Sequence, residues 1–188
     1  MMSAAKPDID IWREMQNGVE DALSTLFQRY YQSLYDYGVK FCQRPELVKD
    51  CIQEVFIYIW EKREKLSLPA SVRAYLLSSY RRALLRKLQQ KLKLEDIHNE
   101  LGIINEVAFA SNKPTDLNDT HFDKIQQVYR EIEELPPRMR EALYLKTFDN
   151  FSYREISEVM GISSQVARNY VCDALQRLRN GIINPQHD

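Results

Sequence analysis

Residues 151–171 read FSYREISEVMGISSQVARNYV, and this stretch decides the fold of the second half of the chain. Ser152, followed three residues later by Glu155, predicts a capping box, in which two side chains satisfy the free amides at a helix start. Gly161 stands where this helix must end with a positive φ, which glycine adopts at little cost. Ser163 can cap the helix that follows. The stretch therefore predicts two helices joined by a tight turn.

Two helices joined in this way form a helix-turn-helix, whose second helix enters the major groove of DNA. Gln and Asn can pair bidentately with adenine, and Arg with guanine or phosphate. The polar residues predicted to face outward on the second helix are Ser164, Gln165, Arg168 and Asn169. A helical hairpin that packs and binds nothing is the alternative, but the caps and the polar face together favour DNA binding. Because Asp173 lies on the same helix, we expect only modest affinity from this segment alone.

Helical periodicity extends over most of the remaining chain. Apolar residues recur at steps of three and four over 22–41, 47–60, 72–88, 122–135 and 139–145. Proline suits the first turn of a helix, so Pro69 is expected to begin the third of these helices and Pro137 the last. In the second helix of the helix-turn-helix, the apolar stripe is expected to include Leu175. No strand pattern interrupts the series, and the sequence predicts an all-α protein.

The helical rhythm is lost between the two halves of the chain. Residues 94–119 are acidic and contain Asn-Lys-Pro-Thr-Asp, which is typical of a flexible linker, with a short helix expected around 101–107. The sequence therefore predicts two small helical domains, over 1–93 and 120–188, joined by a flexible acidic linker.

Composition excludes several classes of protein. The longest apolar run of the 188 residues, Val55 to Trp60, is six residues long, too short to cross a bilayer, and the N-terminus lacks the apolar core of a signal peptide. The three cysteines form no CxxC pair, the histidines are scattered and no glycine-rich loop occurs, so we expect no metal site and no cofactor. Paired acids such as Glu133 and Glu134 have no catalytic partner nearby, so an enzyme is not expected. A cytoplasmic protein is predicted.

The net charge of −1 conceals a strong asymmetry along the chain. Residues 67–94 carry seven cations and no acid, whereas residues 95–124 have a net charge of −5. A solvated helix face usually mixes both signs, so the basic block indicates a surface that binds a polyanion such as nucleic acid.

Three stretches together resemble the extracytoplasmic-function (ECF) sigma factors of bacteria. Residues 48–60, VKDCIQEVFIYIW, are similar to the family's D-x-x-Q-E-V-F-x-x-x-W helix. Residues 73–82, RAYLLSSYRR, are similar to its promoter-melting helix, and residues 134–141, ELPPRMRE, to the E-L-P-x-x-x-R-E entry to its C-terminal domain. The resemblance covers about residues 20–182, in the family's order and spacing. It implies that residues 1–93 correspond to sigma region 2 and residues 120–188 to region 4.

The resemblance implies that the first domain docks on core RNA polymerase through Asp50, Gln53 and Glu54. Independently of the family, residues three and four apart share one face of a helix, so these side chains form a polar patch opposite the apolar stripe. An ordinary solvated helix face is the alternative interpretation.

The resemblance also implies that the basic helix lies on the −10 promoter element, stabilises melted DNA there and captures an unstacked base near the preceding loop. Cations track phosphates, and aromatic faces stack on exposed bases. The candidate residues are Lys62, Arg63, Lys65, Arg73, Tyr75, Tyr80, Arg81, Arg82 and Arg86. Tyr75 and Tyr80 are equally consistent with core packing. The helix-turn-helix is implied to read the −35 element.

The sequence departs from the family at several of these positions. Trp is common in the family where Tyr75 stands, Asn at Arg82 and Asp at Arg86, while basic residues are frequent where Tyr170 and Asp173 stand. The melting helix is therefore more basic than usual and the −35 helix less so. We hypothesise that this protein draws more of its binding energy from the −10 region, since residues 151–188 have zero net charge.

The partners that the resemblance implies are core RNA polymerase, promoter DNA and an anti-sigma factor, commonly a membrane-bound one in this family. The implied activity is promoter-specific transcription initiation, with no covalent chemistry. Two alternatives stay open: a stand-alone helix-turn-helix regulator that never touches polymerase, and a protein-binding adaptor that binds no DNA. The polar patch beside a basic helix argues against the first, and the helix-turn-helix against the second.

Overall fold

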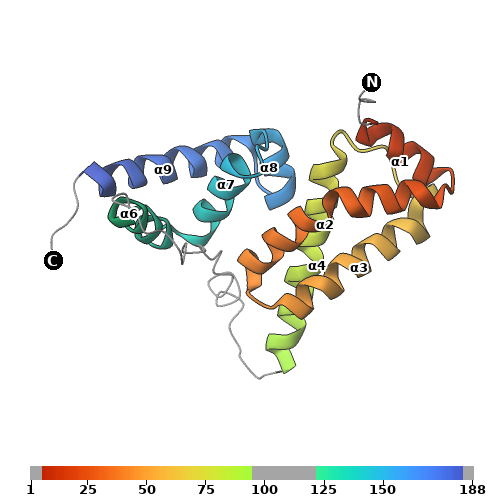
Figure 1. Ribbon diagram of the computed structural model, residues 1–188, viewed down its shortest axis with the longest axis horizontal. Helices are drawn as coiled ribbons and strands as arrows, with labels where there is room; N and C mark the ends of the chain where they lie inside the picture. The colour runs from red at the N-terminus through yellow and green to blue at the C-terminus, as the bar shows by residue number, and fades with distance from the viewer. Residues whose placement is uncertain (1–5, 95–121, 184–188) are drawn as a thin grey trace. The chain divides into compact units, whose positions relative to one another are not determined.

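The structure, a computed structural model, describes residues 6–94 and 122–183 (Figure 1). These residues form α-helices and one short 3-10 helix, without a strand among them, which confirms the all-α prediction. The chain divides into two compact units, residues 1–39 with 44–97 and residues 40–43 with 98–188. Nearly all of the predicted linker, and the helix expected around 101–107, lie outside the described residues.

Within residues 6–94, the first unit contains four α-helices and one 3-10 turn. They are α1 (Asp8–Gln16), α2 (Glu20–Cys42), α3 (Pro45–Lys62), η1 (Arg63–Lys65) and α4 (Val72–Leu94). The periodicity predicted α2, α3 and α4 to within a few residues. It did not predict α1, which has only nine residues.

Helix α4 begins later than Pro69 suggested. The Ser71 hydroxyl accepts a hydrogen bond from the backbone N–H of Ala74 at 3.3 Å, and the Ser71 carbonyl accepts one from Tyr75 at 3.0 Å. Ser71 therefore caps the helix, and a hydroxyl acceptor in this position satisfies an amide that a proline would leave free. The prediction that Pro69 lies in the first turn of this helix is wrong.

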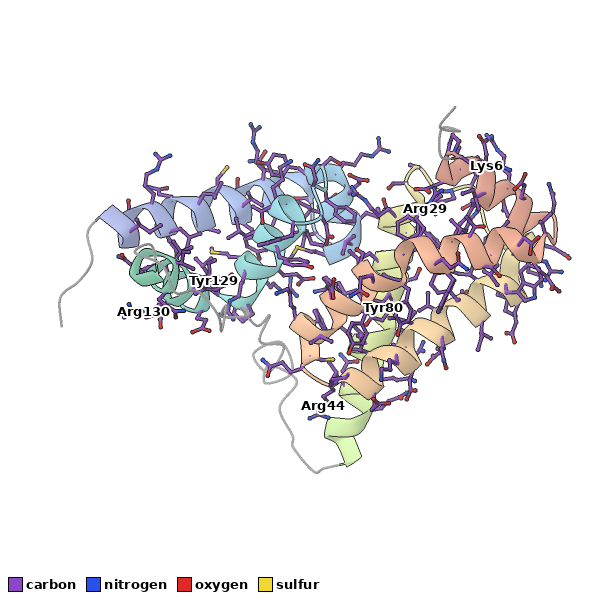
Figure 2. The ribbon with its side chains drawn as sticks, in the orientation of Figure 1. Lys6, Arg29, Arg44, Tyr80, Tyr129 and Arg130 are labelled. Carbon is purple, nitrogen blue, oxygen red and sulfur yellow. The ribbon has the colours of Figure 1, made fainter. Side chains whose placement is uncertain are left out.

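A close approach between α2 and α4 organises the core of the first unit. Gly38 on α2 faces Tyr80 on α4, and a Cβ atom at Gly38 would stand 1.9 Å from the Tyr80 Oη and 2.9 Å from a methyl group of Val48. Tyr80 is fully buried between the helices of this unit (Figure 2). Only glycine leaves room for the phenol ring, so this residue pair fixes the spacing of the two helices.

Helix α1 packs against this core through Ile11, Trp12 and Met15, which are buried. Just before and at its start, Lys6 and Asp8 lie beside α2 (Figure 2). The Asp8 carboxylate accepts hydrogen bonds from Arg29 and from the Tyr30 hydroxyl of α2. Burial and this carboxylate together raise the pKa of Tyr30 well above its ordinary value.

The second unit contains α6 (Phe122–Glu133), α7 (Pro137–Thr147), α8 (Tyr153–Met160) and α9 (Ser164–Ile183). Pro137 stands in the first turn of α7, as predicted. A cluster of Leu135, Leu143 and Ala174, with Met139 and Leu178 against it, joins α7 to α9. Leu175 is 50% exposed, so its predicted place in the buried stripe is wrong. It follows the fully buried Ala174, and a helix turns by about 100° per residue, so Leu175 lies at the edge of the buried face, where no neighbouring element covers it fully.

The caps of the helix-turn-helix form as predicted. The Ser152 hydroxyl accepts from the Glu155 amide, and the Glu155 carboxylate accepts from the Ser152 amide at 2.9 Å. Gly161 ends α8 with a φ of 65°, and the Ser163 hydroxyl accepts from the Val166 amide at 3.2 Å. The turn angle between α8 and α9 is therefore set by local hydrogen bonds.

Among the helices of the described ranges, none combines the length and the apolar character that a membrane span requires.

Candidate nucleic-acid interfaces

The polar patch predicted on α3 exists as one face of that helix. Asp50 and Gln53 are exposed and Glu54 is half-buried, while Cys51 and Ile52 point into the core. The helix turns by about 100° per residue, so the apolar residues are buried and the three polar ones stay together at the surface.

Glu54 joins this patch to the basic helix. Its carboxylate accepts a hydrogen bond from Arg86 and forms an ion pair with Lys87, with 2.9 Å between Lys87 Nζ and Glu54 Oε2. The hydrogen bond to Glu54 raises the pKa of Lys87. Two cations of the basic block are therefore held by an acid from α3, which the charge count along the sequence did not reveal.

A groove of about 510 Å³ runs along the surface between α3 and α4. Its lining includes Tyr58 and Glu54 from α3 and Tyr75, Ser79, Arg82 and Arg86 from α4. The volume is in the range of small-molecule sites. Aromatic rings and guanidinium groups in one groove can bind a base and a phosphate at the same time.

Tyr58 is an aromatic groove residue that the sequence-based prediction did not include. Its side chain is 51% exposed, although it belongs to the apolar run from Val55 to Trp60. It follows Glu54 by four residues, which places it on the polar face rather than in the core. That spacing is the signal that identifies Tyr58 from sequence.

The two candidate tyrosines of α4 have different surroundings. Tyr75 is half-buried and lines the groove, and burial raises the pKa of its hydroxyl. Tyr80 is fully buried, so a base cannot stack on it without opening the core. The structure therefore decides between the two interpretations of Tyr80 in favour of core packing.

The predicted cations around the loop before α4 also differ. Lys62 and Lys65 are exposed. Arg63 folds back over the Trp60 ring, 4.4 Å from its centroid, and donates to the Trp60 carbonyl at 2.9 Å. This arginine therefore holds the loop against α3 rather than extending toward a phosphate. On α4, Arg82 is exposed and donates to the Ser79 hydroxyl at 3.2 Å, and the remaining candidates, Arg73 and Arg81, are half-buried.

The four candidate residues of the recognition helix, Ser164, Gln165, Arg168 and Asn169, are all exposed on the first turns of α9. Gln165 Nε2 donates to Asn169 Oδ1 at 2.9 Å, and the Ser164 hydroxyl donates to the Ser157 hydroxyl at 3.2 Å. These bonds pre-order the polar face that a base edge would meet. Because these hydrogen bonds are exposed, the amide groups can rotate away from each other and form hydrogen bonds with an adenine instead.

A cationic edge flanks this face. The guanidinium of Arg168 lies 5.8 Å from the Tyr153 ring centroid, and Lys146 Nζ lies 5.0 Å from the same centroid. Both cations gain from the negative ring face, an arrangement typical of cation–π contacts. Lys146 was absent from the predicted set, because it precedes the helix-turn-helix and only the fold brings it to Tyr153.

Two family models match the chain, and they match the two units separately. The model described as Sigma-70 region 2 matches residues 26–93, and the model described as Sigma-70, region 4 matches residues 125–178. Together they span well over half of the chain, in the order that the sequence motifs predicted. The chain belongs to the ECF sigma factors. As a sigma factor it binds core RNA polymerase and promoter DNA and directs transcription initiation, which excludes a stand-alone regulator.

Known sigma factors are similar to this one over most of their length. The ECF RNA polymerase sigma factor SigM of Bacillus subtilis (strain 168) is 24% identical over 159 residues, which are 84% of this chain and 93% of SigM. The RNA polymerase sigma factor YlaC of the same organism is 22% identical over 153 residues, which are 76% of this chain and 82% of YlaC.

Two solved structures have a similar fold. CnrH, solved in complex with the cytosolic domain of CnrY, gives a TM-score of 0.62 at 17% identity over 92% of this chain and 94% of CnrH. RpoE from Bartonella quintana, solved with the anti-sigma factor NepR, gives 0.60 at 14% identity over 87% of this chain and 98% of RpoE.

The matched regions contain every predicted site residue of this sigma factor. The docking and −10 candidates lie within the region 2 match, and the recognition-helix candidates within the region 4 match. Helix α1 precedes the region 2 match entirely.

Proposed function

We propose that this sigma factor docks on core RNA polymerase through Asp50, Gln53 and Glu54. The three residues form the polar face of α3, and buried neighbours on the same helix hold that face in place. An acidic and amide-bearing face of this kind suits a partner surface rich in arginine, whose guanidinium binds carboxylates bidentately.

We propose further that the groove between α3 and α4 binds the single strand of the opened −10 element. The observation that carries this proposal is the groove itself, which brings Tyr58 and Tyr75 next to Arg82 and Arg86. An unstacked base finds an aromatic face there, and its flanking phosphates find guanidinium groups. Lys62 and Lys65, exposed on the preceding loop, extend the cationic track.

The −35 element is assigned to α9 of the second unit. Arg168, Gln165 and Asn169 supply the side chains that read base edges, and Lys146 adds a phosphate contact at the side. The net charge of residues 151–188 is zero, so this contact contributes position and specificity more than affinity.

We also propose an anti-sigma factor as the regulatory partner, acting in the cytoplasm where polymerase and promoter are found. Support comes from two proteins of similar fold: CnrH, solved with the cytosolic domain of CnrY, and the sigma factor RpoE, solved with the anti-sigma factor NepR.

The docking proposal is tested by capture of core RNA polymerase on the immobilised full chain. The variant Asp50→Lys with Gln53→Lys changes the patch but leaves Glu54 paired with Arg86 and Lys87. We expect it to lose at least tenfold in polymerase affinity, because the lysines meet arginines of the partner.

The matched control is Gln32→Lys with Asp36→Lys, which alters an exposed glutamine–aspartate pair on α2. It changes the net charge by the same amount. Equal loss in both variants would mean that only overall charge matters, and full capture by the Asp50 and Gln53 variant would remove the proposed docking face.

A further inference from the structure

The loop between α3 and α4 is tied down by a residue from α1, outside the region 2 match. Gln16 is the last residue of α1 and is half-buried. Its Nε2 donates to the Leu66 carbonyl at 2.5 Å and lies 3.5 Å from the Arg63 carbonyl. One amide group therefore faces both ends of the short segment that contains η1.

Arg63 ties the same segment to the end of α3. This side chain covers the Trp60 ring and donates to the Trp60 carbonyl at 2.9 Å. Gly18, two residues beyond Gln16, lies close by, since a Cβ atom there would stand 4.0 Å from Arg63 Nε. The loop backbone is thus clamped between α3 and the end of α1.

Helix α1 also contacts the aromatic part of the groove. Trp12 is fully buried and meets the Tyr75 ring edge to face, with 5.2 Å between centroids and 75° between planes. Such contacts orient a ring as well as burying it. One face of α1 therefore sets both the Tyr75 ring, through Trp12, and the loop carbonyls, through Gln16.

We infer that Gln16 is a positioning residue for −10 recognition, which holds the α3–α4 loop so that the strand meets it in one geometry. This inference rests on the proposed function of the groove. A loop whose carbonyls are tied presents fixed hydrogen-bonding groups to a base, whereas an untied loop presents an ensemble. Gln16 then affects which bases are preferred, while the cations on α4 supply most of the affinity.

The test uses holoenzyme, assembled from core RNA polymerase and the full chain, and a fork-junction DNA whose single-stranded part is a pool of random ten-nucleotide sequences. Bound sequences are compared for the unaltered chain, Gln16→Ala and Gln16→Glu. Gln16→Glu keeps the shape of the side chain but replaces the donor with an acceptor, which faces the Leu66 carbonyl unfavourably. Gln32→Ala is the matched control, because the Gln32 amide bonds only with the exposed Asp36 among the hydrogen bonds of the described residues.

We expect both Gln16 variants to lose base preference at one or two adjacent positions by about three- to tenfold. Their affinity for the unselected pool should stay within twofold, and their capture of core polymerase should be unchanged. Retained preference in both Gln16 variants overturns the inference. So does a loss spread evenly over all positions, or one that Gln32→Ala reproduces, because either outcome indicates general destabilisation.

Failure of the proposed function has a different signature. If the unaltered holoenzyme enriches no motif in the single-stranded segment, the groove does not read the −10 strand and the inference falls with it. If the unaltered chain enriches a motif that the Gln16 variants keep, only the inference about Gln16 fails.

Discussion

The two helices of this sigma factor that we propose to contact DNA, α4 and the start of α9, have different surroundings. Helix α4 is embedded along most of its length, with Leu76, Tyr80 and Leu84 fully buried. The start of α9 is presented on the surface by a capped turn, and its candidate reading residues are all exposed. Helix α4 thus depends on the core of the first unit over most of its length, whereas the start of α9 is oriented by local hydrogen bonds in addition to its buried face of Ala167, Val171 and Ala174.

The two helices also use charge differently. The sequence around α4 carries seven cations, but Arg86 and Lys87 are paired with Glu54 from α3. The charge that α4 offers to DNA is therefore smaller than the count suggests. The hypothesis that the −10 region supplies an unusually large share of the binding energy stays a prediction. The pairing with Glu54 reduces the difference in available positive charge between α4 and residues 151–188, which is the basis of that hypothesis.

The largest effect is expected from removing the core ring of α4. Tyr80→Ala leaves a cavity between α4 and Gly38 of α2, and we expect the first unit to lose about 3–5 kcal/mol of stability. Thermal unfolding of the full chain, followed by circular dichroism, measures this loss. Tyr58→Ala removes a half-exposed ring from the groove between α3 and α4 and should change stability by less than about 0.5 kcal/mol. A small loss of stability in Tyr80→Ala would contradict the conclusion that α4 depends on the core of the first unit.

An intermediate effect is expected from removing the cap that starts α8. Ser152→Ala deletes the hydroxyl that accepts from the Glu155 amide, at a cost of about 1 kcal/mol to the second unit. Duplex −35 binding should weaken together with stability, while polymerase capture through the first unit should not change. Ser24→Ala, on the exposed surface of α2, is a control from outside any cap. Unchanged stability after Ser152→Ala would show that packing rather than the cap orients the turn.

The smallest effect is expected from releasing the paired cations of α4. Exposed ion pairs contribute about 0.2–1 kcal/mol each, so Glu54→Gln should raise the affinity of the full chain for a 12-nucleotide oligothymidylate about two- to fivefold. Fluorescence anisotropy at low salt measures this affinity. Glu61→Gln removes the same charge from the same groove without touching Arg86. If both variants bind the oligothymidylate equally well, the pairing with Glu54 does not limit the binding of DNA by the basic helix.

Much of the fold could be predicted because the signals are local. The capping box at Ser152, the positive φ at Gly161 and the apolar stripes of α2, α3 and α4 depend on neighbours within one or two turns. Helix α1 was missed because a nine-residue helix shows too few apolar repeats to stand out. Leu175 was misplaced because periodicity gives the angle of a residue on its helix but not how far the neighbouring elements cover it.

The sequence predicted the candidate residues of the site but not the contacts between them. The four candidate residues of α9 and the polar face of α3 could be found from helix spacing alone. The pairing of Glu54 with Arg86 and the contact of Gln16 with Leu66 join residues 32 and 50 positions apart. No local pattern encodes such distances.

The sequence was sufficient to predict that this protein is helical, that it carries a helix-turn-helix and that it resembles the ECF sigma factors. The first two properties follow from short-range rules of backbone geometry, capping and hydrophobic periodicity, and the third follows from three motifs in the family's order and spacing. Only the packed structure shows that Tyr80 belongs to the core, that Arg63 holds a loop and that Glu54 pairs with Arg86. Burial and pairing are properties of what lies across from a residue, and only the packed chain brings those partners together.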